Sequence, residues 1–134
     1  MKLAAVLLPV LLLAGCASVG PQTCPVGQAR LRTAQLFFAR QAPDQPRISD
    51  ADFRRYVDQE LTTRFPDGLT VLDGNRQWKG EENRLIRESA KIVLIVLPNA
   101  GDSQTRLTAA REAYKLRFKQ DAILKVTAPA CVSL

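Results

Sequence analysis

The order of local patterns along the chain constrains its fold most, because two helical patterns each lie between strand-like segments. Strand-like composition covers residues 31–40, 69–72, 85–97 and 122–127. Apolar residues recur at helical spacing over residues 49–64 and 103–119. The order strand, helix, strand, strand, helix, strand predicts an α+β domain with the ferredoxin-like βαββαβ arrangement, in which a four-stranded antiparallel sheet carries both helices on one face.

Local signals place some of the element ends. Ser49 with Asp52 three residues later resembles a capping box, which predicts that the first helix begins there. Pro66 disfavours helix at the preceding residue, so this helix is expected to end near residue 64. Asp73-Gly74 is a turn signal inside the second strand pattern, and it predicts that this strand is short or bent before it continues near Trp78.

The first 16 residues form a separate pattern. Lys2 precedes an apolar run that is about 12 residues long, against the roughly 20 needed to cross a bilayer. The run ends in Leu13-Ala14-Gly15-Cys16, which is typical of a bacterial lipobox. We expect residues 1–15 to be a signal peptide and Cys16 to carry a lipid that anchors the protein to a membrane. A plain secretory peptide that is cut elsewhere is the alternative.

The rest of the chain suits one small domain in the cell envelope. Residues 16–28 are predicted to be a lipidated flexible spacer and residues 29–134 a single domain. By analogy with known lipoproteins, Ala17 after the cysteine leads us to expect an outer-membrane location, facing the periplasm. Without Lys2 the chain carries 18 Lys and Arg against 13 Asp and Glu, a net charge of +5. That charge favours anionic headgroups, lipopolysaccharide or wall polymers, and the location argues against nucleic acid as a partner.

Two further cysteines, Cys24 and Cys131, lie near opposite ends of the predicted mature chain. In an oxidising compartment such a pair favours one disulfide over two free thiols, and the chain has no histidine to complete a zinc or iron site, so we expect no metal and no cofactor. In the usual ferredoxin-like strand order, 4-1-3-2, the last strand lies antiparallel beside the first. That pairing would bring both cysteines to the same edge of the sheet, with Cα atoms less than roughly 7 Å apart.

The third strand pattern is apolar on both faces over residues 92–97, although a sheet covered by helices on one side should alternate. Phe37 and Phe38 repeat this feature in the first strand pattern. The second face of the sheet is therefore expected to be covered as well. One hypothesis is a homodimer that stacks sheet to sheet. The alternative is that the hairpin around Trp78, or the chain termini, folds over this face.

Several segments together resemble a family of bacterial lipoproteins catalogued as a domain of unknown function, number 3574. They are residues 64–74, Gln77-Trp78, Arg87-Glu88-Ser89 with Lys91, and Pro129-Ala130-Cys131. The resemblance spans roughly Cys24 to Cys131. The chain departs from the pattern at Ala39 and Arg76, where glycine is expected before Arg40 and Gln77, and both changes are expected to alter local turns. The family brings no established reaction, substrate or catalytic residue.

The central segment supplies the candidate ligand-binding residues. They are Arg64, Asp67, Asp73, Trp78, Arg87 and Glu88. Arginine offers a fork for carboxylate or phosphate, tryptophan a stacking surface, and Glu88 a general base if burial raises its pKa. The structural alternative makes the aspartates turn residues, pairs Arg87 and Glu88 across strands, and buries Trp78 in the core.

A second group of candidates is basic. Arg111, Lys115 and Lys119 recur every four residues and share one face of the second helical pattern, where they either meet anionic headgroups or form an ordinary solvated face.

Two functions fit the sequence. The first is a tethered, non-enzymatic envelope module that binds a partner or small ligand through the sheet face or the Trp78 hairpin. The second is a small-molecule enzyme resembling the dimeric α+β barrel group, with Glu88, Asp73 or a tyrosine as acid or base. No phosphate-binding glycine loop or Gly-x-Ser-x-Gly elbow is present, and a histidine-dependent triad is excluded. We favour the first, and a closed pocket with an ionisable group of perturbed pKa would favour the second.

Overall fold

Strands and helices follow one another in the predicted order. The computed structural model describes residues 23–42 and 44–133. Its elements are β1 (Ala29–Ala39), α1 (Asp50–Tyr56), the π-helical turn η1 (Val57–Leu61), β2 (Thr70–Lys79), the 3₁₀ turn η2 (Glu81–Asn83), β3 (Leu85–Leu97), α2 (Ser103–Phe118) and β4 (Leu124–Val132). None of the helices in this part of the chain has both the length and the apolar character that a membrane span requires.

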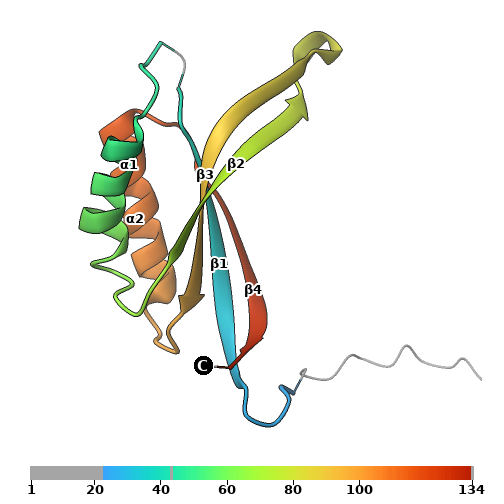
Figure 1. Ribbon diagram of the computed structural model, residues 1–134, viewed down its shortest axis with the longest axis vertical. Helices are drawn as coiled ribbons and strands as arrows, with labels where there is room; N and C mark the ends of the chain where they lie inside the picture. The colour runs from blue at the N-terminus through green and yellow to red at the C-terminus, as the bar shows by residue number, and fades with distance from the viewer. Residues whose placement is uncertain (1–22, 43, 134) are drawn as a thin grey trace, which may run out of the picture.

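The four strands form one antiparallel sheet with the order β2-β3-β1-β4, which is the predicted order 4-1-3-2 read from the other edge. Both helices pack on the same face of this sheet (Figure 1). The ferredoxin-like α+β prediction is therefore confirmed. One face of the sheet is buried under helices, and no helix of residues 23–42 and 44–133 lies on the opposite face, which we call the open face.

The core lies between the sheet and the two helices. Leu36 and Phe38 of β1 are fully buried against Tyr56 of α1 and Tyr114 of α2. The Phe38 ring lies 4.6 Å from the Tyr114 ring and 5.5 Å from the Tyr56 ring, centroid to centroid, in tilted and edge-to-face contacts that aromatic rings prefer. Each tyrosine hydroxyl donates to a backbone carbonyl at 2.8 Å, Tyr56 to Ala110 and Tyr114 to Ala39.

The first helix begins where its capping signal predicts. Ser49 is extended, and its hydroxyl accepts a hydrogen bond from the Asp52 backbone N–H at 3.0 Å. The helix continues from α1 into η1, where the Thr62 N–H reaches the carbonyl of Val57 at 2.8 Å. Regular helix ends at Leu61, three residues before the predicted end, and turns lead from there to Pro66.

The prediction of a short or bent second strand is wrong. β2 is one strand of 10 residues that pairs with β3 along its whole length, and Gly74 sits inside the ladder opposite Ala90. A Cβ at Gly74 would lie 2.7 Å from Cδ1 of Ile92, so this glycine gives the Ile92 side chain room rather than making a turn. Beyond it, residues 75–89 form a two-stranded ribbon, here called the arm, that extends away from the helices (Figure 1).

The last strand runs further than predicted, to Val132 rather than Thr127, and therefore contains Cys131. Pro129 is tolerated because β4 is an edge strand, where one side of the backbone needs no ladder partner. Cys131 forms a disulfide with Cys24, with a Cα–Cα distance of 5.4 Å. The predicted disulfide is thus present, and it ties the segment before β1 to the end of β4.

Candidate functional site

The open face presents apolar side chains in rows that cross the sheet. Because Leu36 and Phe38 point toward the helices, their neighbours in β1 point to the open face. Strand register places four apolar residues side by side in one row: Leu72, Ile92, Phe37 and Leu124. The adjoining rows are Thr70, Leu94, Gln35 and Val126, and then Val96, Thr33 and Ala128. None of these 11 residues is charged, and no other described segment covers them.

Exposure confirms that this face is not part of the core. Leu72 and Leu124, at the two ends of the central row, are 44% and 52% exposed. The arm continues the line of β2 and β3 instead of folding back over the sheet, so the hypothesis that the Trp78 hairpin covers this face is wrong (Figure 1). The chain termini are the other expected cover. The C-terminal residues up to Val132 belong to β4 itself, and residues 1–22 lie outside the described residues.

A hollow of about 850 Å³ lies at the open face, between the start of β2 and the end of β3. Leu31, Thr33, Leu94 and Val96 line it from the sheet, and the turn before β2 supplies Asp67. The walls are thus mainly apolar. A concave apolar surface of this size is suited to receive another apolar surface.

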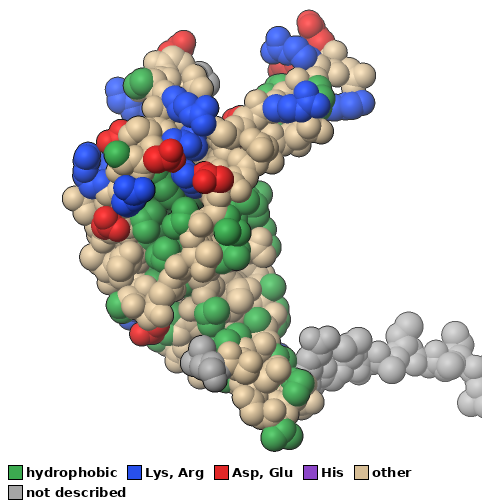
Figure 2. Space-filling view, in the orientation of Figure 1, with side chains coloured by type: hydrophobic (Ala, Val, Ile, Leu, Met, Phe, Trp, Pro, Cys, Tyr) green, Lys and Arg blue, Asp and Glu red, His purple; other side chains and the backbone are tan. Residues whose placement is uncertain are grey.

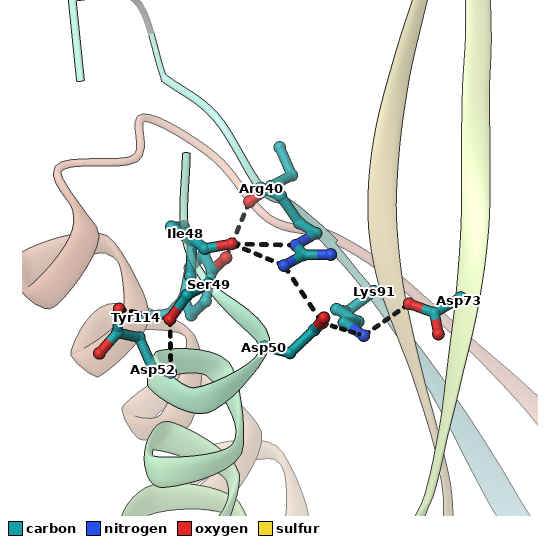
Figure 3. Close-up of polar contacts among 9 residues, drawn as sticks. Arg40, Ile48, Ser49, Asp50, Asp52, Asp73, Lys91 and Tyr114 are labelled. Atoms are coloured by element: carbon teal, nitrogen blue, oxygen red, sulfur yellow. Dashed lines mark hydrogen bonds and ion pairs between the residues drawn. The ribbon is translucent and has the colours of Figure 1, made fainter. Parts of the chain in front are cut away.

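Four charged side chains meet on the helix side, at the base of the arm, and we call them the charged cluster (Figure 3). Arg40 donates from Nε and Nη2 to the Ile48 carbonyl at 3.1 and 2.7 Å, and its Nη2 lies 3.1 Å from Asp50. Lys91 Nζ lies 2.8 Å from the same Asp50 oxygen and 2.5 Å from Asp73. The cluster joins the end of β1, the start of α1, β2 and β3.

Burial and charge show what the charged cluster does. Arg40 and Lys91 are buried, whereas the two carboxylates face solvent. The hydrogen bond from Lys91 lowers the pKa of Asp50, and the hydrogen bonds to Asp50 and then Asp73 raise the pKa of Lys91. Lys91 therefore stays protonated, and each positive charge has a negative neighbour. Through these ion pairs the cluster connects the start of α1 to β2 and β3.

Only part of the charged cluster was visible in the sequence. The sequence offers Asp73 as a candidate ligand-binding residue, and Lys91 is part of the family resemblance, but no sequence motif points to Arg40 or Asp50. The available signal was Lys91 itself, because a lysine in an apolar strand is buried only when it has anionic partners.

On the arm, Trp78 lies on the open side and is 39% exposed, so it is not a core residue. The Arg76 guanidinium lies 5.4 Å from its ring centroid and also pairs with Glu88 at 2.9 Å. Arg87 points to the opposite side, where its Nε donates to the Gln77 side chain at 2.9 Å. Arg87 and Glu88 therefore each pair with a side chain of β2, as the structural alternative predicts.

The two remaining candidates lie at the other end of β2. Arg64 donates to the Glu60 carbonyl and carboxylate, both at 2.7 Å, in a contact within the end of the first helix. Asp67 precedes Gly68, whose φ of 130° fits the predicted turn. The six candidates are therefore not brought together: two lie near the start of β2, and the others divide between the two sides of the β2–β3 ribbon.

The basic row on α2 is partly structural. Arg111 donates from Nε and Nη2 to the Ile123 carbonyl at 3.2 and 2.8 Å, which holds the loop before β4 against the helix. Lys115 pairs with Glu112 at 3.2 Å. These contacts favour the reading of this row as a helix surface with local partners.

A second hollow, of about 610 Å³, lies on the helix side beside Arg30 and Arg32. Burial raises the pKa of Tyr56 and Tyr114, but neither tyrosine lines this hollow or the one on the open face, and neither do Lys91 and Asp50. Across residues 23–42 and 44–133, no three His, Cys, Asp or Glu side chains gather in a way that would hold a metal ion. The hollows are thus separate from the groups whose pKa is shifted.

Solved structures share this architecture at low sequence identity. A phage SAM lyase in complex with S-methyl-5'-thioadenosine superposes with a TM-score of 0.56 and 11% identity, covering 84% of this chain and 95% of that one. A phage SAM lyase in its apo state gives a TM-score of 0.55 and 13% identity, covering 85% of this chain and 97% of that one. CutA from Synechococcus elongatus gives 0.51 and 7%, over 79% and 81%. These similarities show the fold alone.

Comparison by sequence identifies a family but no individual relative. No curated protein matches this chain. A family model described as protein of unknown function (DUF3574) matches residues 33–134, which include every strand and helix of the domain except the start of β1. The chain therefore belongs to this family of proteins of unknown function.

Proposed function

We propose that this protein is a lipid-anchored component of the bacterial cell envelope and works as a non-enzymatic binding module, whose open face takes a second copy of the same chain. The observation that carries the proposal is the uncharged row Leu72, Ile92, Phe37 and Leu124, which crosses all four strands and has no cover among the described residues. Water exclusion from such a surface favours association.

The size and composition of the open face support a second copy as its occupant. Three rows about 6.8 Å apart across four strands about 4.8 Å apart cover roughly 400 Å², and the hollow beside them extends this apolar surface toward the roughly 800 Å² per partner of a standard interface. The three central rows contain no charge, as in the core of a stable interface. A two-fold axis would place the same rows opposite each other, so no different partner surface is required.

Two features support the envelope location. Leu13-Ala14-Gly15-Cys16 supplies the lipid attachment signal, although it lies outside the described residues. The Cys24–Cys131 disulfide suits an oxidising compartment. The groups with shifted pKa values are engaged in structural contacts, which supports a binding role over an enzymatic one.

Light scattering on residues 16–134 carrying Cys16→Ser tests the dimer. We expect twice the monomer mass, and a monomer for the variant that combines Leu72→Lys with Leu124→Lys. The matched control combines Leu85→Lys with Leu116→Lys, because both are apolar residues, 45% and 83% exposed, that do not lie on the open face. The control should remain dimeric. A monomeric parent protein, or equal loss of the dimer in both variants, would refute the sheet-face interface.

Mass spectrometry of the membrane fraction tests the anchor separately. A diacylglyceryl modification is expected on Cys16, and Cys16→Ser should move the protein to the soluble fraction. An unmodified Cys16 in membranes would contradict the lipid anchor and leave the result on the dimer unaffected.

A further inference from the structure

The hollow of about 610 Å³ is basic and lies at the end of the domain where the described chain begins. Arg30 and Arg32 contribute from β1, and the loop between β3 and α2 forms the facing wall with Asn99 and Gly101. In Figure 1 this end is the lower one, opposite the tip of the arm. The hollow is open to solvent, since both arginines are exposed.

Charge in this hollow is not balanced. None of its lining residues is acidic, and within the described residues neither Arg30 nor Arg32 forms an ion pair. Arg32 donates to the hydroxyl of Thr127 at 3.1 Å, which orients its guanidinium without neutralising it. Asp102, at the end of the loop between β3 and α2, forms an ion pair with Arg106 at 2.8 Å. The hollow therefore presents two guanidinium groups to an anion.

Chain length places this end of the domain near the proposed anchor. Seven residue steps separate Cys16 from Thr23, where the described chain begins, and they span at most about 25 Å. The disulfide from Cys24 to Cys131 then fixes the chain to β4. Val26, in the turn between Cys24 and β1, is fully exposed, as expected of an apolar side chain that meets a membrane interface.

We propose that this basic hollow binds the phosphate of an anionic lipid headgroup in the membrane that holds the anchor, and so fixes the orientation of the domain on the membrane surface. Guanidinium groups match phosphate oxygens in a bidentate geometry. The inference rests on the proposed lipid anchor, which would keep the hollow at high effective concentration near headgroups, so that even a weak site is occupied. The open face and the arm remain free for other contacts.

Vesicle binding of the unlipidated chain, residues 16–134 with Cys16→Ser, tests this inference without help from the anchor. The probes are vesicles of phosphatidylcholine alone and of phosphatidylcholine mixed with phosphatidylglycerol. We expect binding only to the anionic vesicles, and at least a tenfold loss in the variant that combines Arg30→Gln with Arg32→Gln, roughly as two basic contacts predict. The matched control combines Arg54→Gln with Arg55→Gln, which removes the same charge from exposed positions on α1.

These outcomes distinguish a specific binding site from general electrostatic attraction between a basic protein and an anionic vesicle. Equal losses in both double variants, or no preference for anionic vesicles, would overturn the inference. Saturation by inorganic phosphate without any binding to vesicles would also overturn it, because the site would then serve free phosphate. Circular dichroism checks that the variants are folded, and Arg30→Gln alone replaces the double variant if that one is not. An acylated Cys16 with no headgroup binding would reject this inference while leaving the proposed function intact.

Discussion

At the scale of single residues, Arg40 should matter more for stability than Lys91, although both are buried cations of the charged cluster. Arg40 is the donor to the buried Ile48 carbonyl, which Arg40→Met would leave without this partner, so we expect a loss of about 2 kcal/mol. Lys91→Met leaves exposed carboxylates that water can solvate, and should cost less than about 1 kcal/mol. Urea unfolding measures both, with the exposed Arg54→Met as the control. Equal losses for the two cluster variants would contradict this account.

The pH dependence of stability should also follow from single residues. The chain has no histidine, so the free energy of unfolding should stay nearly constant from about pH 6 to pH 9. Burial raises the pKa of Tyr56 and Tyr114, and ion pairing raises that of Lys91. A raised folded pKa gives stability that is complete below the unfolded value, about 10, and is lost as the pH rises above it. Urea unfolding of Tyr114→Phe should show a shallower alkaline loss than the parent protein, and an unchanged slope would count against the tyrosine assignment.

At the scale of elements, the arm should be the least stable part of the sheet. Residues 75–89 form a two-stranded ribbon beyond the helices, and an isolated ribbon is only marginally stable in water. Figure 2 shows charged side chains gathered on the arm and around the start of α1, with a gap between these two regions. Hydrogen exchange should therefore be faster for arm amides than for the amides of β1 paired with both neighbours. If arm and β1 amides were equally protected in the variant that combines Leu72→Lys with Leu124→Lys, the arm would be stabilised by contacts that this structure does not contain.

Element order was predictable, whereas several element ends and the grouping of charged residues were not. The Ser49–Asp52 cap is a local signal and placed the start of α1 correctly. Asp73-Gly74 also looks like a local turn, but pairing with β3 dominates there and keeps the strand continuous. The charged cluster depends on the same long-range register, because Asp73 and Lys91 come together only when β2 and β3 pair, and Asp50 arrives from α1.

At the scale of the whole molecule, strand order and cysteine spacing support each other. β4 lies beside β1 because the strand order is β2-β3-β1-β4, and this places Cys131 directly opposite Arg30, close to Cys24. The same arrangement collects the start of β1, the end of β4 and the basic hollow at one end, while the arm lies at the other (Figure 1). This arrangement separates the end that we propose meets the membrane from the face that we propose binds a second copy.

The disulfide should stabilise the whole domain rather than one element. Cys24 and Cys131 are separated by 107 residues, so the bond closes almost the entire described chain into one loop. A loop of this length restricts the unfolded chain strongly, and we expect reduction to lower the free energy of unfolding by about 3 to 4 kcal/mol. Urea unfolding with and without dithiothreitol measures the loss. The double variant Cys24→Ser with Cys131→Ser should match the reduced protein and not respond to dithiothreitol. If reduction changed only hydrogen exchange near Val26 and the end of β4, the bond would be a local clamp, and the stability of the fold would come from the sheet and its helices alone.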